Sequence, residues 1–268
     1  MLFPFVLFGV IVTAAVCGFS DIIWPAYLWA VPLTFICALV AGVILYVIFL
    51  LIVSLIIGTK KEPETRSSFC RGLIVYTVGV ILSFFRIKVE VSGAELIPYG
   101  TRWLLVGNHR SMFDPMVAIW GLRRHELSFV AKPSIFRIPI ARQLLHRDFH
   151  LAVDRENNRE ALKTILKAAD FIKRDISSMG IYPEGTRSKD GNMLPFRNGA
   201  FKIAQRARVP VVVTTIENTD MVTSRFPLRS TTVKLTVHAV FDAETVAELS
   251  TNDLSDKARE IMLGHLGR

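Results

Sequence analysis

The chain has 268 residues, of which 51% are hydrophobic, and a formal net charge of +9 at pH 7. This length is sufficient for one large domain with its own core. Its three cysteines form neither a metal-binding spacing nor a disulfide framework, which excludes a disulfide-stapled module and is typical of a reducing compartment.

The first 58 residues are almost free of charge. Up to Thr59 the only charged residue is Asp21, and two apolar runs, at 2–20 and 33–58, are each long enough for the about 20 residues of a bilayer crossing. We predict that residues 1–58 form a membrane anchor of two helices, retained because no basic segment precedes the first run. Alternatively, the first run is re-entrant, because Pro25 and Pro32 interrupt the connection between the runs.

Lys60 and Lys61 follow the second run directly. Positive charge is in excess on cytoplasmic flanks, so we expect an integral membrane protein of the plasma membrane or another inner membrane, with the part after the anchor facing the cytoplasm. The basic remainder fits anionic lipids or phosphorylated substrates, and the anchor favours these over nucleic acid. The bilayer is an expected partner, while the oligomeric state is left open.

Residues 59–87 are expected to form a linker and an interfacial helix. An apolar run of 13 residues, from Leu73 to Phe85, lies between Arg71 and Arg86 and is too short to span a bilayer. A helix at the membrane surface fits this length, and an ordinary core helix fits it equally well.

Residues 88–268 alternate short apolar segments with helical ones, which predicts an α/β domain with a mixed sheet flanked by helices. Strands are expected near 87–93, 103–107, 127–131, 149–153, 179–182, 209–217 and 232–240, and helices near 114–122, 134–145, 157–176, 199–207 and 243–263.

A histidine and an aspartate stand where the strand at 103–107 gives way to a polar turn. His109 precedes Asp114 by five positions, too far for one helix face. A turn that places Asp114 at the N-cap of a helix starting at Pro115 would let the two side chains converge. Asp114 would then fix the imidazole tautomer while His109 accepts a proton. Taken alone, this spacing is common, and a capping aspartate beside an ordinary loop histidine is the alternative.

No motif for a protein nucleophile accompanies this pair. The chain has no G-x-S-x-G, H-E-x-x-H, P-loop or G-x-G-x-x-G sequence, and the neighbouring Ser111 has the features of a turn residue. A base without a nucleophile implies that the substrate supplies the attacking group.

A second polar segment spans residues 181–191, IYPEGTRSKDG. Apolar residues stop at Tyr182, and the turn through Gly185 then presents Thr186 and Arg187. Strand ends in α/β sheets are where ligands bind, and an arginine beside a glycine turn suits a phosphate. A solvated turn is the alternative for this segment alone.

Two further cations end predicted strands. Lys132 follows the strand at 127–131, and Arg155 follows that at 149–153. Cations at one sheet edge would form a phosphate pocket with Arg187. An ion pair is the alternative for Arg155.

Four segments in order resemble the glycerolipid acyltransferase family, and within it the 1-acylglycerol-3-phosphate acyltransferases. They are NHRSMFD at 108–114, the segment at 129–155, YPEGTRS at 182–188 and VPVVVTT at 209–215. Together they cover about residues 96–216 and favour the catalytic interpretation over the alternatives above. The family usually has phenylalanine in place of Tyr182, a glycine after the Ile-Pro step in the second segment, and a second proline in place of Val213.

The resemblance implies transfer of a fatty acyl group from coenzyme A or acyl carrier protein to the sn-2 hydroxyl of lysophosphatidic acid, giving phosphatidic acid. His109 would act as the base and Asp114 would orient it, and neither a metal nor a cofactor is required. Arg187 would hold the acceptor phosphate, Glu184 would order the glycerol hydroxyl or Arg187, and Asn108 would stabilise the oxyanion. The implied substrate-binding residues are Asn108, Lys132, Arg155, Glu184, Gly185, Thr186 and Arg187.

Three other functions stay open at this point. The acceptor could be glycerol-3-phosphate or another lysophospholipid; His109 could activate water in a thioester or lipid hydrolase; or the basic body could bind anionic lipid without catalysis. The sequence also leaves open the acyl length and the choice between acyl-CoA and acyl carrier protein.

Overall fold

A computed structural model describes residues 2–18, 26–58, 62–188 and 191–266. The chain divides into two compact units, Met1–Lys60 and Lys61–Arg268. The predicted boundaries at residues 58 and 87 stay predictions.

The N-terminal unit is a pair of helices, α1 (Phe3–Gly18) and α2 (Tyr27–Ile56). They pack closely where α1 carries Gly9, since a Cβ atom at this position would lie 3.0 Å from the ring of Phe35 on α2. Small residues of this kind let apolar helices approach one another. Most of the large apolar side chains on both helices remain exposed, as expected for surfaces that face lipid rather than water.

Only part of the predicted anchor is tested by these helices. Residues Leu28–Ile56 form the one described helix that is long and apolar enough to cross a membrane. Helix α1 has 16 residues, fewer than the about 20 that a crossing needs, so the second crossing stays a prediction. Pro32 lies inside α2 and not in a connection, while Pro25 lies outside the described residues. The apolar α2 indicates association with a membrane.

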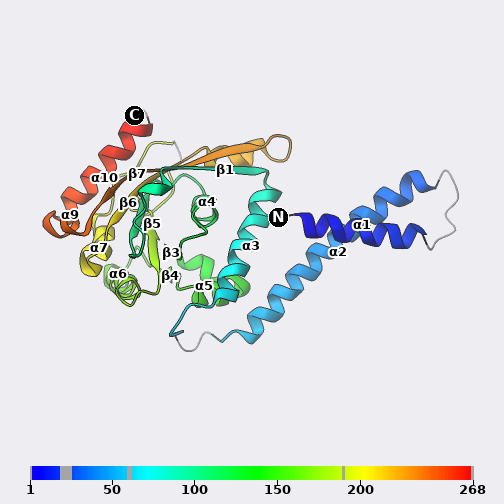
Figure 1. Cartoon of the computed structure of the whole chain (residues 1–268), viewed down its shortest axis with the longest axis horizontal. Helices are drawn as coiled ribbons and strands as arrows, with labels where there is room; N and C mark the ends of the chain where they lie inside the picture. The colour runs from blue at the N-terminus through cyan, green and yellow to red at the C-terminus, as the bar shows by residue number, and fades with distance from the viewer. Residues whose placement is uncertain (1, 19–25, 59–61, 189–190, 267–268) are drawn as a thin grey trace. The chain divides into compact units, whose positions relative to one another are not determined.

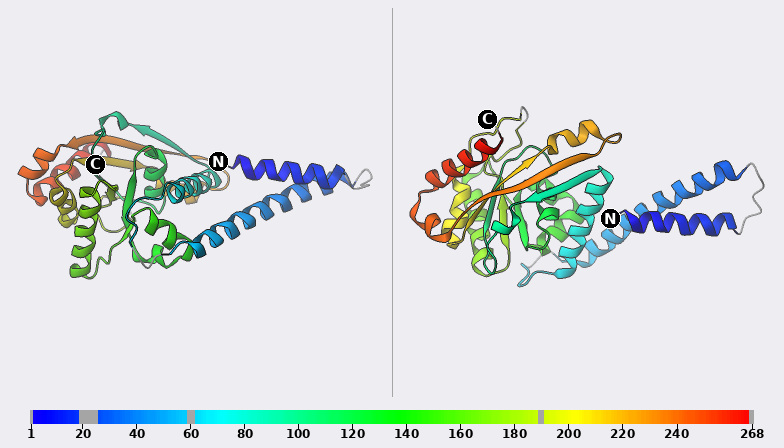
Figure 2. Two further views of the ribbon diagram at one scale, coloured as in Figure 1. Left: turned by 60° about the horizontal axis from the view of Figure 1, so that its bottom comes forward. Right: turned by 45° about the horizontal axis from the view of Figure 1, so that its top comes forward.

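The C-terminal unit is built on a seven-stranded sheet in the order β1-β7-β6-β2-β5-β3-β4. From β6 to β4 neighbouring strands are parallel; β7 is antiparallel to β6, and β1 is parallel to β7. The long β7 lies beside β1 in both views of Figure 2. The predicted mixed sheet is thus confirmed. The strands are β1 (Ile87–Ser92), β2 (Leu104–Gly107), β3 (Leu127–Ala131), β4 (Leu151–Ala152), β5 (Ser178–Ile181), β6 (Val211–Glu217) and β7 (Thr231–Phe241).

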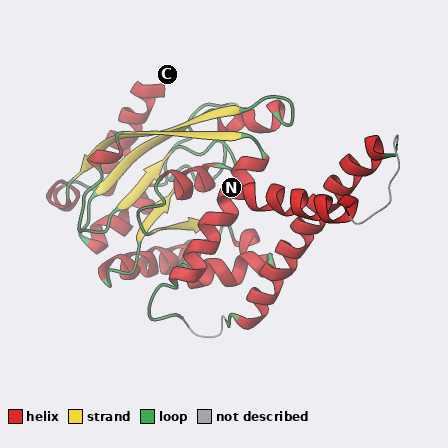
Figure 3. Cartoon of the chain, turned by 45° about the vertical axis from the view of Figure 1, so that its right-hand side comes forward, coloured by secondary structure: helices red, strands yellow, loops and turns green. Residues whose placement is uncertain are grey.

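Helices cover both faces of this sheet (Figures 1 and 3). The α-helices of the unit are α3 (Ser68–Phe84), α4 (Asp114–Gly121), α5 (Pro139–Arg147), α6 (Asn158–Lys173), α7 (Lys202–Ala207), α8 (Val222–Arg225), α9 (Ala243–Glu248) and α10 (Thr251–Leu266). Short 3-10 helices are η1 (Ala94–Leu96), η2 (Pro133–Arg137), η3 (Asn198–Phe201) and η4 (Thr219–Met221).

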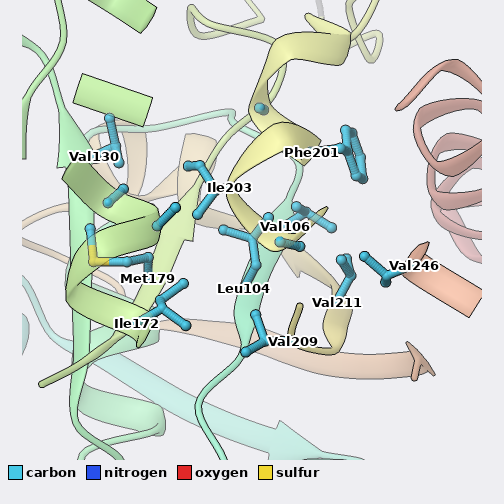
Figure 4. Close-up of a cluster of buried hydrophobic side chains, with 14 of the residues drawn as sticks. Leu104, Val106, Val130, Ile172, Met179, Phe201, Ile203, Val209, Val211 and Val246 are labelled. Carbon is cyan, nitrogen blue, oxygen red and sulfur yellow. The ribbon is translucent and has the colours of Figure 1, made fainter. Parts of the chain in front are cut away.

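Strand alternation places the main core between the sheet and α6, α7 and α10. Leu104 and Val106 on β2 point into this cluster with Phe201 and Ile203, as Figure 4 shows. Leu105, between them, is equally buried but faces the opposite side, where α3 and α4 pack. Burial on both faces explains why the central parallel strands read as continuous apolar runs.

The structure divides three predicted helices. The segment 134–145 is split into η2 and α5, because Pro139 starts a new helix. The segment 199–207 begins as the 3-10 helix η3 before α7. The segment 243–263 is split because Ser250 and Asp253 cap each other at the start of α10: the Ser250 hydroxyl accepts from Asp253 N at 3.2 Å, and the Asp253 carboxylate accepts from Ser250 N at 3.3 Å.

A buried ionic cluster ties the segment around the start of α3 to the sheet. Asp148 is fully buried and pairs with Arg66 at 2.8 Å, Arg71 at 3.2 Å and His150 Nε2 at 3.0 Å. Burial opposes ionisation of Asp148, but the hydrogen bond from His150 and the two arginines outweigh it and lower the pKa of this carboxyl. Helix α3 is therefore partly a core element, with Leu82 among its buried residues. Its predicted contact with the membrane surface remains a prediction.

Two histidines join α10 to β7. The rings of His238 and His265 stack with centroids 3.8 Å apart, and His238 Nε2 lies 2.7 Å from Thr215 Oγ1. Burial, together with the charge of His265, lowers the pKa of His238 to about 4.

This contact predicts acid sensitivity. Between about pH 6.5, the ordinary histidine pKa, and about pH 4, the unfolded chain binds a proton at His238 that the folded chain excludes, so stability falls as pH falls through this window. Replacement His238→Gln keeps a polar partner for Thr215 and removes the titration. We expect the melting temperature of the variant to decrease less than that of the unmodified protein between pH 7 and pH 4.5. Parallel curves for the two proteins would contradict this assignment.

Candidate active site

The candidate site lies at the carboxyl ends of three neighbouring strands. His109 follows β2, Glu184 follows β5, and Thr219 follows β6, and β2 pairs in parallel with both other strands. The carboxyl edge of a largely parallel sheet is where α/β proteins bind ligands.

His109 and Asp114 form a hydrogen-bonded pair. Nδ1 of the imidazole lies 2.8 Å from Oδ2 of the carboxylate, and the Asp114 side chain is fully buried while that of His109 keeps 14% exposure. A carboxylate can only accept, so Nδ1 carries the proton and Nε2 presents a lone pair. The predicted convergence of the two side chains is thus present, with the outer nitrogen available to accept a proton.

Three further donors hold Asp114 in place. Its Oδ2 accepts the backbone N–H groups of Arg110 and Ser111, both at 2.7 Å, and its Oδ1 accepts the hydroxyl of Thr219 at 2.5 Å. The helix itself begins at Asp114 with Phe113 at the N-cap, so the predicted capping position was wrong by one residue. The function of the cap is nonetheless served, since the carboxylate orders the turn in front of the helix.

Residues after β5 hold the backbone of His109 by hydrogen bonds. Glu184 accepts the N–H of His109 at 2.6 Å and that of Leu194 at 2.9 Å, while Ser188 donates its own N–H to the His109 carbonyl at 2.9 Å. Burial raises the pKa of Glu184, although the two backbone donors oppose that shift. In this structure Glu184 therefore contacts the catalytic loop and not Arg187.

The ring of Tyr182 packs against the imidazole of His109. Its ring stacks on His109 with centroids 4.6 Å apart and an interplanar angle of 9°, and on its other side it faces Phe129 at 5.6 Å and 18°. The Tyr182 hydroxyl is buried and has no hydrogen-bond partner among the described residues. Burial raises the pKa of this phenol well above its usual value, so it stays neutral.

Asn108 joins the ends of two strands. Its Nδ2 donates to the carbonyl of Ile216 at 2.9 Å, and its Oδ1 accepts the N–H of the same residue at 2.7 Å. The preceding Gly107 allows the close approach, because a Cβ atom there would lie 2.9 Å from Thr214 Oγ1. Asn108 is thus engaged in holding β2 to β6, and its role at an oxyanion stays a prediction.

Gly185 is buried and directly precedes the exposed part of the second motif. Gly185 adopts a φ of +75°, in the left-handed region, and its missing side chain makes room for Arg197, whose Nε would lie 2.9 Å from a Cβ atom. Thr186 and Arg187 are exposed on the loop. Their contact with substrate is untested.

The two remaining predicted cations are less closely connected to the site. Lys132 is exposed just before η2. Arg155 is half-buried, and its carbonyl accepts from Arg197 at 3.0 Å. Burial and the charge of Arg197 lower the pKa of Arg155. Within the described chain neither cation forms an ion pair with the buried site, so their place at a phosphate remains a prediction.

Among the described residues, no group of three or more His, Cys, Asp and Glu side chains could hold a metal ion. A pocket does lie beside the catalytic loop, with α10 forming its apolar wall. It is lined by Asn108, Arg110, Glu184, Ser188, Gly191, Asn192, Met193, Leu263 and Leu266.

Two contacts of the site were not predicted from the sequence. Thr219 lies in η4, after β6, and donates to Asp114; the polar run that follows this strand was the sequence signal for it. Tyr182 was noted for its identity but not for its stacking on His109. Both depend on strand order, which the sequence does not reveal directly.

Comparison with known proteins shows which part of the chain is similar to acyltransferases. Residues 88–217 match the model of the Acyltransferase family. The matched segment includes His109, Asp114 and Glu184. This part of the chain is therefore similar to the acyltransferase family, as the resemblance of the four segments implied.

Among its relatives, the chain is similar to proteins named 1-acyl-sn-glycerol-3-phosphate acyltransferase. It is 31% identical to one from Cocos nucifera over 56% of this chain and 47% of the relative, and 33% identical to one from Salmonella typhimurium over 53% and 58%. For an Escherichia coli relative the identity is 28% over 69% and 75%. The chain thus spans about half the length of the plant relative.

The fold is also that of a solved acyltransferase. The crystal structure of the 1-acyl-sn-glycerophosphate (LPA) acyltransferase PlsC from Thermotoga maritima superposes with a TM-score of 0.63 at 20% identity, over 98% of this chain and 96% of that one. This likeness confirms the predicted mixed sheet flanked by helices.

The stacked tyrosine gives a test of how the site is packed. Replacement Tyr182→Phe keeps the ring on His109 and removes a buried hydroxyl without a partner, whose burial costs about 1–3 kcal/mol. We expect the free energy of unfolding to stay equal or rise by about 1 kcal/mol, measured by denaturant titration. The control, Tyr182→Leu, loses the ring and should be less stable. A Phe variant that is clearly destabilised would mean that the hydroxyl has a bonding role.

Proposed function

We propose that this protein transfers a fatty acyl group from acyl-CoA or acyl carrier protein to the sn-2 hydroxyl of 1-acylglycerol-3-phosphate, producing phosphatidic acid. The observation that carries the proposal is the His109–Asp114 pair, 2.8 Å apart, in a part of the chain that is similar to the acyltransferase family. The names of the similar proteins support the choice of acceptor.

The chemistry needs only a base and a positioned alcohol. Nε2 of His109 takes the proton of the acceptor hydroxyl as its oxygen attacks the thioester carbonyl. The tetrahedral intermediate then collapses, the C–S bond breaks, and the imidazolium returns its proton to the leaving thiolate. General-base catalysis of this kind contributes about 10²–10⁴ in rate.

Neighbouring groups orient His109 for proton transfer. The carboxylate of Asp114 holds Nδ1–H and stabilises the imidazolium that forms during the reaction. The face of Tyr182, stacked 4.6 Å away, adds a favourable contact with a cationic ring. Glu184 and Ser188 fix the backbone of the residue, so its side chain needs little further ordering.

The exposed loop after β5 is suited to the anionic head group of the acceptor. Arg187 would contact the phosphate, with Lys132 and Arg155 as further candidates, because a guanidinium offers two parallel donors to phosphate oxygens. Gly185 and Thr186 would contribute the turn and its hydroxyl. Holding the hydroxyl near the base is worth several kcal/mol.

Product analysis tests the proposed reaction. The purified protein should convert lysophosphatidate and either acyl-CoA or acyl carrier protein thioester into phosphatidate, identified by mass spectrometry. Acceptors such as glycerol-3-phosphate and other lysophospholipids should react more slowly. Free fatty acid as the main product would instead indicate a hydrolase, and turnover of another acceptor but not lysophosphatidate would exclude the assignment.

Removing the base should stop catalysis while leaving the fold intact. We expect His109→Ala to lower turnover at least about a hundredfold, because no other group in the site replaces Nε2. Circular dichroism and the melting temperature should be close to those of the unmodified protein. The matched control is His265→Ala, an exposed histidine on α10, which should retain activity. Unchanged turnover in the His109 variant would remove the basis of the mechanism.

We also propose that the C-terminal unit faces the cytoplasm, supported by the lysines that follow the apolar run of α2. A C-terminal epitope tag should resist added protease in intact cells or spheroplasts and be cleaved in inverted membrane vesicles. A periplasmic marker cleaved in spheroplasts provides the control. Cleavage of the tag in intact spheroplasts would show the opposite orientation.

A further inference from the structure

The pocket beside the catalytic loop joins the active site to α10. Asn108 and Arg110, on either side of His109 in the chain, line it together with Glu184, while Leu263 and Leu266 form an apolar wall. The pocket is small and shallow: its cavity volume is about 10 Å³, and its remaining space is open to solvent. A cavity of this size has no room for an acyl chain, so only a small polar head group would bind, at the open side of the pocket.

Arg110 brings an incompletely paired charge to this pocket. Its side chain is 16% exposed, and its Nη2 lies 3.5 Å from a carboxylate oxygen of Asp220. Its Nε–H is buried without a hydrogen-bond partner among the described residues. A buried donor of a charged group left unpaired is costly, so a rotation of the side chain that brings this donor to an anion in the pocket would stabilise the guanidinium.

Other polar side chains of the pocket are already engaged. The Asn108 amide bonds to both backbone groups of Ile216, and both oxygens of Glu184 accept backbone N–H groups. Arg110, in contrast, has a long ion pair with a partly exposed partner and an unused donor edge. The charge available to a ligand in this pocket is therefore positive.

We propose that Arg110 binds a phosphate monoester of one substrate in this pocket. A phosphate dianion accepts the parallel N–H groups of a guanidinium, and it would displace the weaker contact with Asp220. The ligand has two possible sources: the phosphate of the acceptor lipid and the 3′-phosphate of coenzyme A. The inference rests on the proposed function, because both sources are substrates of that reaction.

Kinetics with two donors distinguish these sources. In Arg110→Gln we expect the KM of one phosphate-bearing substrate to rise about 10-fold to 100-fold with a smaller change in kcat, as for loss of a hydrogen-bonded charge. An acyl carrier protein thioester carries a phosphodiester and no phosphate monoester. A raised KM for lysophosphatidate with both donors assigns the acceptor phosphate; a raised KM for acyl-CoA alone assigns the 3′-phosphate.

A binding measurement keeps the inference independent of turnover. In the full-length His109→Ala protein, lysophosphatidate or coenzyme A should raise the melting temperature, and adding Arg110→Gln should abolish that rise. Dephospho-coenzyme A is the control for the 3′-phosphate, and the exposed Arg124→Gln is the control for general charge. Absence of phosphatidate with the unmodified enzyme would refute the proposed function, whereas equal ligand stabilisation with and without Arg110 would refute this inference.

A second variant tests the same site without removing Arg110. Asp220→Asn breaks the ion pair and frees the guanidinium, so the KM of the same substrate should fall about twofold or more. A rise in that KM would overturn the proposal, as would Arg110→Gln kinetics in which only kcat falls.

Discussion

The active site depends on one buried carboxylate. The Asp114 carboxylate is inaccessible to solvent, and donors from two separate segments compensate its burial. The turn after β2 supplies His109 and two backbone N–H groups. The 3-10 helix η4, after β6, supplies the hydroxyl of Thr219. A buried carboxylate without these partners would cost several kcal/mol. The contacts that compensate this burial are the same ones that orient the imidazole, so the fold and the catalytic geometry have a common requirement.

A second histidine–aspartate pair in the same domain shows how His109, the proposed base, differs from a structural histidine. His150 also contacts a fully buried carboxylate, that of Asp148, at 3.0 Å. Its other nitrogen, Nδ1, accepts the N–H of Phe129 at 3.1 Å, and its side chain is only 3% exposed. Both ring nitrogens of His150 are therefore engaged, whereas Nε2 of His109 has no hydrogen bond to another described residue and its side chain is partly open. Accessibility of the second nitrogen, and not the pairing itself, separates a base from a structural histidine.

The sequence revealed the strands and the convergence of His109 with Asp114, because apolar runs and a short turn are local signals. It did not reveal Thr219, which lies 105 positions from Asp114 and arrives beside it only because β6 pairs with β2. For the same reason, Glu184 was read as a substrate ligand, while the structure shows it bonded to the backbone of His109. The division of the C-terminal helix at Ser250 was a local signal, a capping box, that the apolar periodicity concealed.

In the proposed mechanism, the groups that perform chemistry are separate from the groups that contact the substrate. His109 is held at Nδ1, at its backbone and on one ring face, which leaves Nε2 open, so the proposed proton transfer needs little reorganisation. The cations assigned to recognition, such as Arg187, are exposed, and flexible side chains there can follow an amphiphile whose tail lies in a bilayer. The leucines of α10 beside Arg110 give the pocket an apolar and a charged side, matching a lipid head group at its junction with glycerol. An ordered His109 beside exposed cationic side chains such as Arg187 would suit a substrate whose tail stays in the membrane.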